Sequence, residues 1–317
     1  MMKNIKKYII ITVALFSCCS GILQAQSQYD NEFTVSVGAG SSALKYQINN
    51  EQSKAGFGGQ LGAGYTHYFS KTIGVSLGLE AAMFGSSLNM KNISFEQQIQ
   101  TPPGLSGRFL LQAKYDALEE KQTAIMLQVP VMLQFRFPVS EKSFLFLGTG
   151  VKVGFPVSSK WKQDISSLST TGYSDYTNQY YINMPNHGFS TYSGLSTSGK
   201  LELKSAVSLA LEGGLKFNIG EGQFLYTGLF LDYGLNDIYK EPATKASLLI
   251  YNNASPADYT YNSVLTSSQL SDGIKPFAIG VKIKIGIGMG SEKTSQPKQK
   301  KEKVVPKKQK PEPVWGW

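Results

Sequence analysis

The sequence predicts an all-β fold, an eight-stranded antiparallel transmembrane β-barrel of the up-and-down type, and three observations support this. Apolar residues alternate with glycine or polar residues over eight segments, the period of a β-strand and not of a helix. The links between these segments are alternately short and long. The chain also begins with the layout of an export signal.

The eight predicted strands each place a continuous apolar face opposite a face of glycine, hydroxyl and charged residues. Their lengths are close to or above the about 9–11 residues that a tilted strand needs to cross the hydrocarbon of a membrane. Because a small barrel has little space inside, the glycine-rich face is expected to point inward. The segments are 33–40, 57–69, 73–83, 125–137, 145–155, 207–217, 225–233 and 277–287.

The links predict which end of the barrel faces which compartment. Short links occur at 70–72, 138–142 and 220–222, and long links at 42–56, 86–122, 159–200 and 236–273. Outer-membrane barrels have short periplasmic turns and long extracellular loops, so both chain ends are expected in the periplasm. Aromatic residues fall near both predicted membrane boundaries, as interfacial girdles do.

Residues 1–25 predict a secretory signal peptide. Three lysines precede an apolar core at 8–16, and residues 23–25 favour cleavage before Gln26. The alternative is a lipoprotein signal with the lipid on Cys18. Cys18 and Cys19 are the two cysteines of the chain, so cleavage before Gln26 leaves a mature protein without a disulfide or thiolate site.

The formal net charge of +9 belongs mainly to the chain ends. Residues 291–317 hold eight lysines, three glutamates and four prolines, a composition that predicts a disordered, basic periplasmic tail. The domain prediction is therefore a signal peptide (1–25), an outer-membrane barrel (26–290) and this tail. Since the barrel region is close to neutral, the basic pI does not indicate nucleic-acid binding.

Three segments resemble the PorT-like outer-membrane β-barrel family. The stretch 127–133, with Pro130 in an apolar strand, carries the clearest resemblance, and 144–154 and 231–238 add to it. The resemblance spans residues 30–290. It implies an OmpA-like eight-stranded barrel without a following peptidoglycan-binding domain, and it implies no catalytic residue.

The inward face carries the candidate site residues, because charges facing lipid near the membrane centre cost about 2–4 kcal/mol for lysine or arginine. Two interpretations stay open for them: a salt-bridged plug that closes the lumen, which we favour, and a gated path for ions or small solutes. The predicted lumen charges are Glu80, Arg136, Lys152, Glu212, Lys216, Asp232, Lys282 and Lys284.

Catalysis is not expected from the residue types available. His67 and His187 are the two histidines of the chain, so the sequence offers no pattern with metal-ligand spacing, and no cofactor is expected. A hydrolase at the outer rim would use His187 with Ser190, but His67 falls at the periplasmic end. A nucleophile and base in a loop without an orienting residue form a weak catalytic arrangement.

The sequence therefore predicts a bacterial outer-membrane barrel with a structural or surface-interaction role. The alternatives are a narrow channel for ions or small solutes and, third, a rim hydrolase. The expected partners are outer-membrane lipids and the barrel assembly machinery. The links 159–200 and 236–273, rich in tyrosine, serine, glycine and asparagine, are candidate contact surfaces for a surface ligand. The tail is a candidate contact for envelope polymers.

Overall fold

The computed structural model describes residues 30–48, 51–100, 108–240, 247–267 and 273–289. In these residues the regular structure is β-strand, apart from the single 3-10 turn η2 (Pro185–His187). No helix of this part of the chain is long and apolar enough to cross a membrane. The predicted signal peptide and tail lie outside the described residues.

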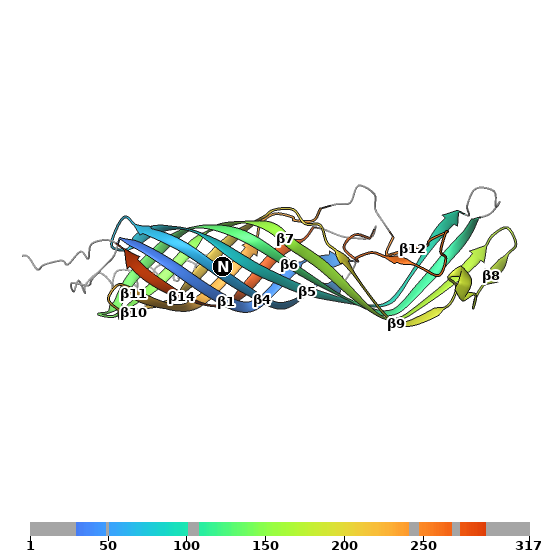
Figure 1. Cartoon of the computed structure of the whole chain (residues 1–317), viewed down its shortest axis with the longest axis horizontal. Helices are drawn as coiled ribbons and strands as arrows, with labels where there is room; N and C mark the ends of the chain where they lie inside the picture. The colour runs from blue at the N-terminus through green and yellow to red at the C-terminus, as the bar shows by residue number, and fades with distance from the viewer. Residues whose placement is uncertain (1–29, 49–50, 101–107, 241–246, 268–272, 290–317) are drawn as a thin grey trace, which may run out of the picture. The chain divides into compact units, whose positions relative to one another are not determined.

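Eight strands pair in a closed antiparallel ring, and this confirms the predicted barrel (Figure 1). Each strand pairs with the strands before and after it in the chain order of the ring, and the ring closes where β14 pairs with β1. The ring consists of β1 (Asn31–Lys45), β4 (Lys54–Tyr68), β5 (Ile73–Gln100), β6 (Arg108–Ser140), β7 (Ser143–Ser174), β10 (Ala206–Gly220), β11 (Gln223–Gly234) and β14 (Lys275–Met289).

Glycine permits the close approach of β1 and β14 where the ring closes. Gly40 and Gly280 lie opposite each other in the register of these strands. A Cβ on Gly40 would lie 2.1 Å from the carbonyl oxygen of Ile279, and one on Gly280 would lie 2.2 Å from that of Ala39. Any larger residue would push the two strands apart, which explains glycine on the inward face here.

Short turns join β4 to β5, β6 to β7 and β10 to β11 at one end of the barrel, which we call the turn end. The opposite end, the loop end, carries the longer links. The link 42–56 forms a small hairpin of β2 (Gln47–Ile48) and β3 (Glu51–Gln52). The link 236–273 contains a second small hairpin of β12 (Leu249–Ile250) and β13 (Thr260–Tyr261).

The two longest predicted loops are largely strand, which corrects the sequence interpretation. Residues 86–122 continue β5 and β6 past the barrel, and 159–200 continue β7 and return as β8 (Gln179–Tyr181) and β9 (Thr191–Lys200). Outward positions in this region are polar and apolar residues such as Tyr115 and Ile165 are buried on the inner face, so the alternation reverses while the backbone pairing continues. We call the four-stranded sheet formed by these parts of β5, β6, β7 and β9 the extension.

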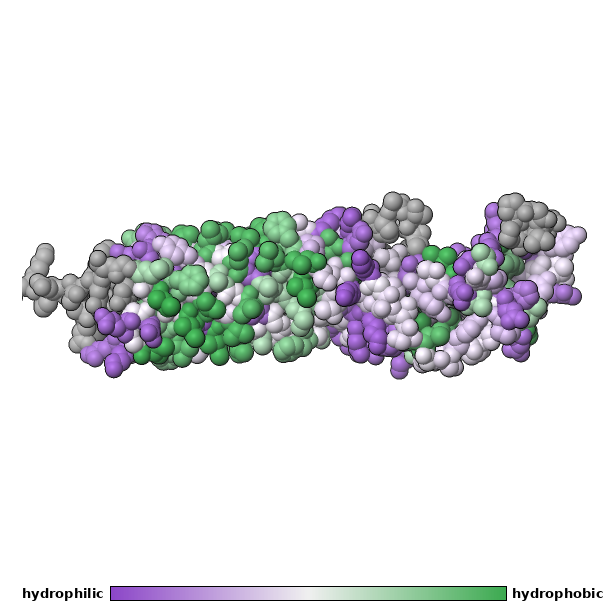
Figure 2. Space-filling model, viewed as in Figure 1, coloured by the Kyte–Doolittle hydropathy of each residue, from purple (hydrophilic) through white to green (hydrophobic). Residues whose placement is uncertain are grey.

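The barrel carries a belt of exposed apolar side chains on its outer face, visible as the green zone in Figure 2. Beyond it, towards the extension, the surface becomes more hydrophilic. Aromatic residues lie near both edges of the belt: Phe33, Tyr65 and Phe69 near the turn end, and Phe57, Phe155 and Tyr233 near the loop end. The aliphatic members between them include Val35, Val37, Leu61, Leu77, Leu79, Val131, Leu147, Val151, Leu211, Leu229, Val281 and Ile283.

Candidate functional site

The lumen of the barrel gathers the charged residues that the sequence placed on the inward face. All eight predicted residues lie among the described residues. Seven of them are buried, and the Lys284 side chain is 12% exposed. Because a buried charge is costly unless it is paired, the partners of these groups determine what the lumen can do.

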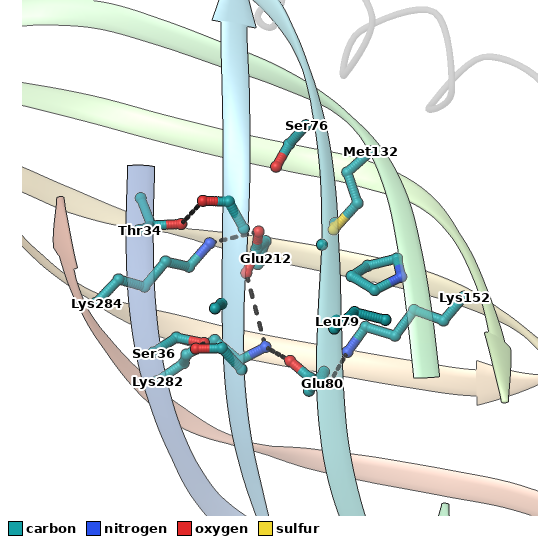
Figure 3. Close-up of a pocket in the computed structure, with 15 residues that line it drawn as sticks. Thr34, Ser36, Ser76, Leu79, Glu80, Met132, Lys152, Glu212, Lys282 and Lys284 are labelled. Atoms are coloured by element: carbon teal, nitrogen blue, oxygen red, sulfur yellow. Dashed lines mark hydrogen bonds and ion pairs between the residues drawn. The ribbon is translucent and has the colours of Figure 1, made fainter. Parts of the chain in front are cut away.

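Glu80 lies at the centre of the network. Its carboxylate accepts hydrogen bonds from the Nζ of Lys152 at 2.7 Å and the Nζ of Lys282 at 2.6 Å (Figure 3). Lys152 also donates to Asp232 at 2.8 Å, and Gln60 donates to the same carboxylate oxygen. Strands β4, β5, β7, β11 and β14 are therefore tied together across the inside of the ring.

A second carboxylate, Glu212 of β10, links this centre to the rest of the lumen. It accepts a hydrogen bond from Lys284 at 2.6 Å and from the Gln134 amide at 3.1 Å. Lys282 lies between the two carboxylates, 4.0 Å from the nearer Glu212 oxygen (Figure 3). The cavity beside these groups, lined by them and by hydroxyls such as Thr34 and Ser36, measures about 40 Å³, enough for a few water molecules.

The turn end of the lumen holds a separate ion pair, of which the sequence predicted Lys216 but not Glu32. Lys216 donates to Glu32 at 2.6 Å, and the Tyr226 hydroxyl donates to the other oxygen of the same carboxylate. Glu32 shares the parity of the inward residues Thr34 and Ser36, so extending the alternation one step past Phe33 would have found it. Its side chain is completely buried.

Arg136 lies near this pair and is held differently from the lysines. Its Nε donates to the carbonyl oxygen of Lys71, in the turn between β4 and β5, at 3.0 Å. Its guanidinium stacks on the Tyr68 ring, 3.6 Å from the ring centre. The guanidinium thereby fixes a short turn against the inside of the ring.

Apolar side chains close the loop end of the lumen. Inward residues of the ring, among them Phe84, Met126 and Phe230, pack in one buried cluster with Leu249 and Leu265 of the segment 247–267. This segment belongs to the last long link, which thus folds back over the mouth of the barrel. Between the charged network and the loop end, the lumen is therefore filled by these apolar side chains, which we call the apolar plug.

A buried carboxylate fastens that segment to the extension. Glu120 of β6 accepts hydrogen bonds from the Ser263 hydroxyl at 2.6 Å, the Val264 amide at 2.8 Å, the Gln163 amide at 2.6 Å and the Gln122 amide at 2.8 Å. Its outward neighbours Glu119 and Lys121 form an exposed ion pair, so this level lies beyond the apolar belt. Burial raises the pKa of Glu120, and the four donated hydrogen bonds act in the opposite direction.

The far part of the extension has its own aromatic cluster. Phe189, next to η2, packs edge-on against Phe109 of β6, with ring centres 5.4 Å apart, and stacks with Tyr181 of β8 at 6.2 Å. Tyr251 and Tyr259 of the last link complete the cluster, and the Tyr259 hydroxyl donates to the carbonyl oxygen of Gly188. The two links proposed as contact surfaces thus form one packed unit.

The histidines show no catalytic arrangement among the described residues. The imidazole of His187, in η2, forms no hydrogen bond or ion pair there, and only its backbone bonds to Met184 and Tyr251. His67 lies at the turn end, where Nδ1 is 2.7 Å from the side-chain oxygen of Asn31. Within the described ranges, no group of three or more histidine, cysteine or acidic residues could hold a metal ion.

The closed ring, its apolar belt and its ion-paired interior define the chain as a transmembrane β-barrel. No family model matches it. No curated protein matches it either. The resemblance to the PorT-like family accordingly stays a prediction.

Solved structures similar to this chain are outer-membrane proteins. They include Ail, the attachment invasion locus protein of Yersinia pestis, in complex with the heparin analogue sucrose octasulfate (15% identity, 81% of this chain and 99% of that chain, TM-score 0.27). They also include OprG of Pseudomonas aeruginosa (15%, 82% and 99%, TM-score 0.33) and the outer membrane protease OmpT of Escherichia coli (9%, 85% and 99%, TM-score 0.30). Likeness this distant does not extend to ligands or activity.

Proposed function

We propose that this protein is a closed bacterial outer-membrane barrel that anchors an ordered β-sheet extension on the cell surface, where the extension makes the protein's contacts. The observation that carries the proposal is the contrast between the two halves of the molecule. The lumen is filled by side chains, whereas the strands of the extension continue past the apolar belt as a hydrogen-bonded sheet.

The apolar belt supports the membrane location. Leu229 is 65% exposed, Leu61 62% and Val281 58%, and they are members of a belt spread over the strands of the ring. Exposed apolar patches on soluble monomers rarely exceed a few hundred Å², so a belt of this extent fits a hydrocarbon environment. In Figure 2 the continuous green zone covers the barrel and gives way to a more hydrophilic surface towards the extension.

The extension supports a role in surface interaction. Its tip presents Tyr176, which is 91% exposed, together with Tyr180 and Ile182. Tyrosine supplies large contact area at a low cost in side-chain entropy, and serine and glycine around it supply adaptable hydrogen bonding. The sheet beneath is held by the aromatic cluster around Phe189, so the contact surface is supported by a packed base.

Two further partners remain proposals that rest on the sequence. Insertion by the barrel assembly machinery follows from the proposed location. Contact of the basic tail with anionic envelope polymers follows from its eight lysines in residues 291–317, which lie outside the described residues.

Cysteine labelling tests the orientation. In intact cells, a membrane-impermeant maleimide is expected to label Tyr176→Cys, at the tip of the extension, and to leave Glu221→Cys, in the turn between β10 and β11, unlabelled. Permeabilising the outer membrane should expose Glu221→Cys. The mature chain would hold no other cysteine after the predicted cleavage. Labelling of both variants, or of Glu221→Cys alone, in intact cells would contradict the proposed orientation.

Planar bilayer recordings separate the closed barrel from the narrow channel. We expect no reproducible unit conductance steps, because an ion would have to cross both the paired carboxylates of the lumen and the apolar plug at the loop end. An outer-membrane porin recorded in the same bilayers provides the positive control. Unit steps that Glu212→Gln or Arg136→Gln alters would favour the channel instead.

A further inference from the structure

Exposed lysines gather around the loop-end rim of the barrel and the adjoining start of the extension, beyond the loop-end edge of the apolar belt. Six lie on strands of the ring, beyond the apolar part of each strand, and the other two lie at the end of β9 and in the connection from β9 to β10. In Figure 2 a hydrophilic zone succeeds the green belt towards the extension. We call the following residues the lysine collar: Lys45, Lys54, Lys121, Lys160, Lys162, Lys200, Lys204 and Lys275.

Six of these lysines lie directly opposite one another on paired strands. Lys45 of β1 faces Lys275 of β14 in the register, Lys160 of β7 faces Lys200 of β9, and the third pair joins β6 to β7. Like charges directly opposite each other destabilise a sheet. A repeated arrangement of this kind on the exposed face indicates that something outside the protein neutralises it.

The third pair, Lys121 and Lys162, is partly neutralised within the protein. Lys121 lies 3.2 Å from Glu119, and Lys162 lies 3.3 Å from Asp164. The first two pairs form no ion pair with any acidic residue in the described part of the chain. These two pairs are therefore the part of the collar that lacks a counter-charge.

The opposite rim of the barrel is not basic. Its exposed charged turn residues, Lys71, Glu141, Lys142 and Glu221, balance one another. The positive charge is thus specific to the rim that faces the cell surface in the proposed orientation.

The position of the collar selects what can neutralise it. Lys45 Nζ lies over the ring of Phe277, 3.6 Å from its centre, and Phe277 lies opposite Tyr233, a residue of the loop-end edge of the belt. The ammonium group is therefore held at the boundary between hydrocarbon and water, where lipid headgroups lie. The positive potential attracts soluble anions only from their bulk concentration, whereas the bilayer itself holds headgroup phosphates at this height.

We propose that the lysine collar binds the phosphate groups of lipid headgroups in the outer leaflet, with each opposed lysine pair sharing a phosphate. This inference rests on the proposed membrane location. The Cβ atoms of directly opposite residues are about 4.5–5.5 Å apart, so two ammonium groups can converge on one phosphate. The phosphate turns the repulsion of each pair into attraction.

The test compares vesicles of phosphatidylcholine alone with vesicles that also contain lipid A carrying its phosphates. The variant Lys200→Gln/Lys275→Gln removes one lysine from each pair without a counter-charge. The matched control Lys114→Gln/Lys142→Gln removes two exposed lysines away from the collar, one in the extension and one at the turn end. The readout is the unfolding midpoint of the inserted protein, titrated with the phosphorylated lipid, which gives an apparent dissociation constant.

We expect the phosphorylated lipid to raise the unfolding midpoint of the wild type and the control, and the collar variant to bind it roughly 30-fold more weakly at low salt, since a lysine near an anionic surface contributes about fivefold. In phosphatidylcholine alone, the collar variant should unfold at the same or a higher midpoint than the wild type, because it lacks the lysine–lysine repulsion. A structural role of the lysines would not produce this reversal between lipids.

Three results would contradict the proposed phosphate binding by the collar. The phosphorylated lipid could raise the unfolding midpoint of the variant as much as that of the wild type. Lipid A without its phosphates, or inorganic phosphate added to phosphatidylcholine vesicles, could also raise the midpoint of the wild type as much as phosphorylated lipid A does. Each of these can occur while the protein inserts normally. Failure of the wild type to insert into either vesicle contradicts the proposed function itself, so the two failures are distinguishable.

Discussion

Replacing Lys152 by methionine is expected to lower the free energy of unfolding by about 3–5 kcal/mol. Lys152 is buried and is bonded to both Glu80 and Asp232, at 2.7 and 2.8 Å. Methionine fills similar space but leaves two buried carboxylates short of a cation, and an uncompensated buried charge costs far more than the pair was worth. Urea unfolding in detergent, followed by the mobility of unboiled protein on a gel, measures the change.

A matched control separates this effect from loss of any lysine. Lys240→Gln removes one partner of an ion pair at 2.8 Å with Glu202, in which the two side chains are 56% and 71% exposed. Exposed pairs contribute between about 0 and 1 kcal/mol, so this variant should unfold close to the wild type. Equal behaviour of the two variants would mean that the lumen network does not stabilise the barrel.

The barrel itself could be predicted because strand alternation is a local property. The inward residues Glu80, Lys152 and Asp232 were identified from parity alone, and they are buried in the structure. The partners of these residues could not be predicted. Lys152 and Asp232 meet across the lumen from β7 and β11, and that meeting depends on the register of every intervening strand pair, which parity does not specify.

The extension was misjudged because its outward residues are polar. Along 86–122 the apolar residues move to the inner face and the outer face becomes polar, yet β5 and β6 stay paired as far as Gln100 and Arg108. Backbone hydrogen bonding needs no apolar outer face once the strands leave the hydrocarbon. Polar composition was therefore taken for loop, and the inward set that includes Tyr115 and Leu118 was overlooked.

Glu120 was missed for a related reason. In the sequence it stands beside Glu119 in an apparently hydrophilic loop, and nothing local distinguishes the two. Only the folded extension turns Glu119 outward, to an exposed pair with Lys121, and Glu120 inward, to Ser263 and Val264. Two of its four partners, Ser263 and Val264, come from a link more than 140 residues away along the chain.

Replacing Glu120 by alanine is expected to loosen the segment 247–267 by about 3 kcal/mol. The substitution removes the acceptor of the Val264 amide, the Gln163 amide and the Ser263 hydroxyl, and a buried donor left without a partner costs about 1–3 kcal/mol. Gln163 keeps its bond to the carbonyl oxygen of Asn262, so the loss is local. The barrel strands should keep their stability, and the effect should appear in the hydrogen exchange of the Val264 amide.

The same carboxyl should make this attachment depend on pH. Burial raises the pKa of Glu120 above its ordinary value of 4.5 while the segment is attached. When the segment is released, the Glu120 carboxyl is exposed and loses its proton more easily. Below the ordinary value both states are protonated and the attachment is strongest. As the pH rises through and beyond that value, the released state is favoured and stability falls until the folded pKa is passed.

The groups around Glu120 identify it as the source of such a slope. Its donors Gln122, Gln163 and Ser263 do not titrate in this range. The titratable neighbour is the Tyr46 phenol. Burial and the charge of Glu120 both raise the pKa of this phenol, so it stays neutral. Among the described residues, no lysine, arginine or histidine forms an ion pair with Glu120.

Exchange protection of the Val264 amide, corrected for the intrinsic exchange rate, measures the effect between pH 5 and pH 8 in detergent. We expect protection to fall with rising pH in the wild type and to stay constant in Glu120→Gln, which keeps the shape without the charge. The adjacent variant Glu119→Gln, which removes an exposed carboxyl, should retain the wild-type slope. A slope that survives in Glu120→Gln, or disappears in Glu119→Gln, would assign the pH dependence to another group.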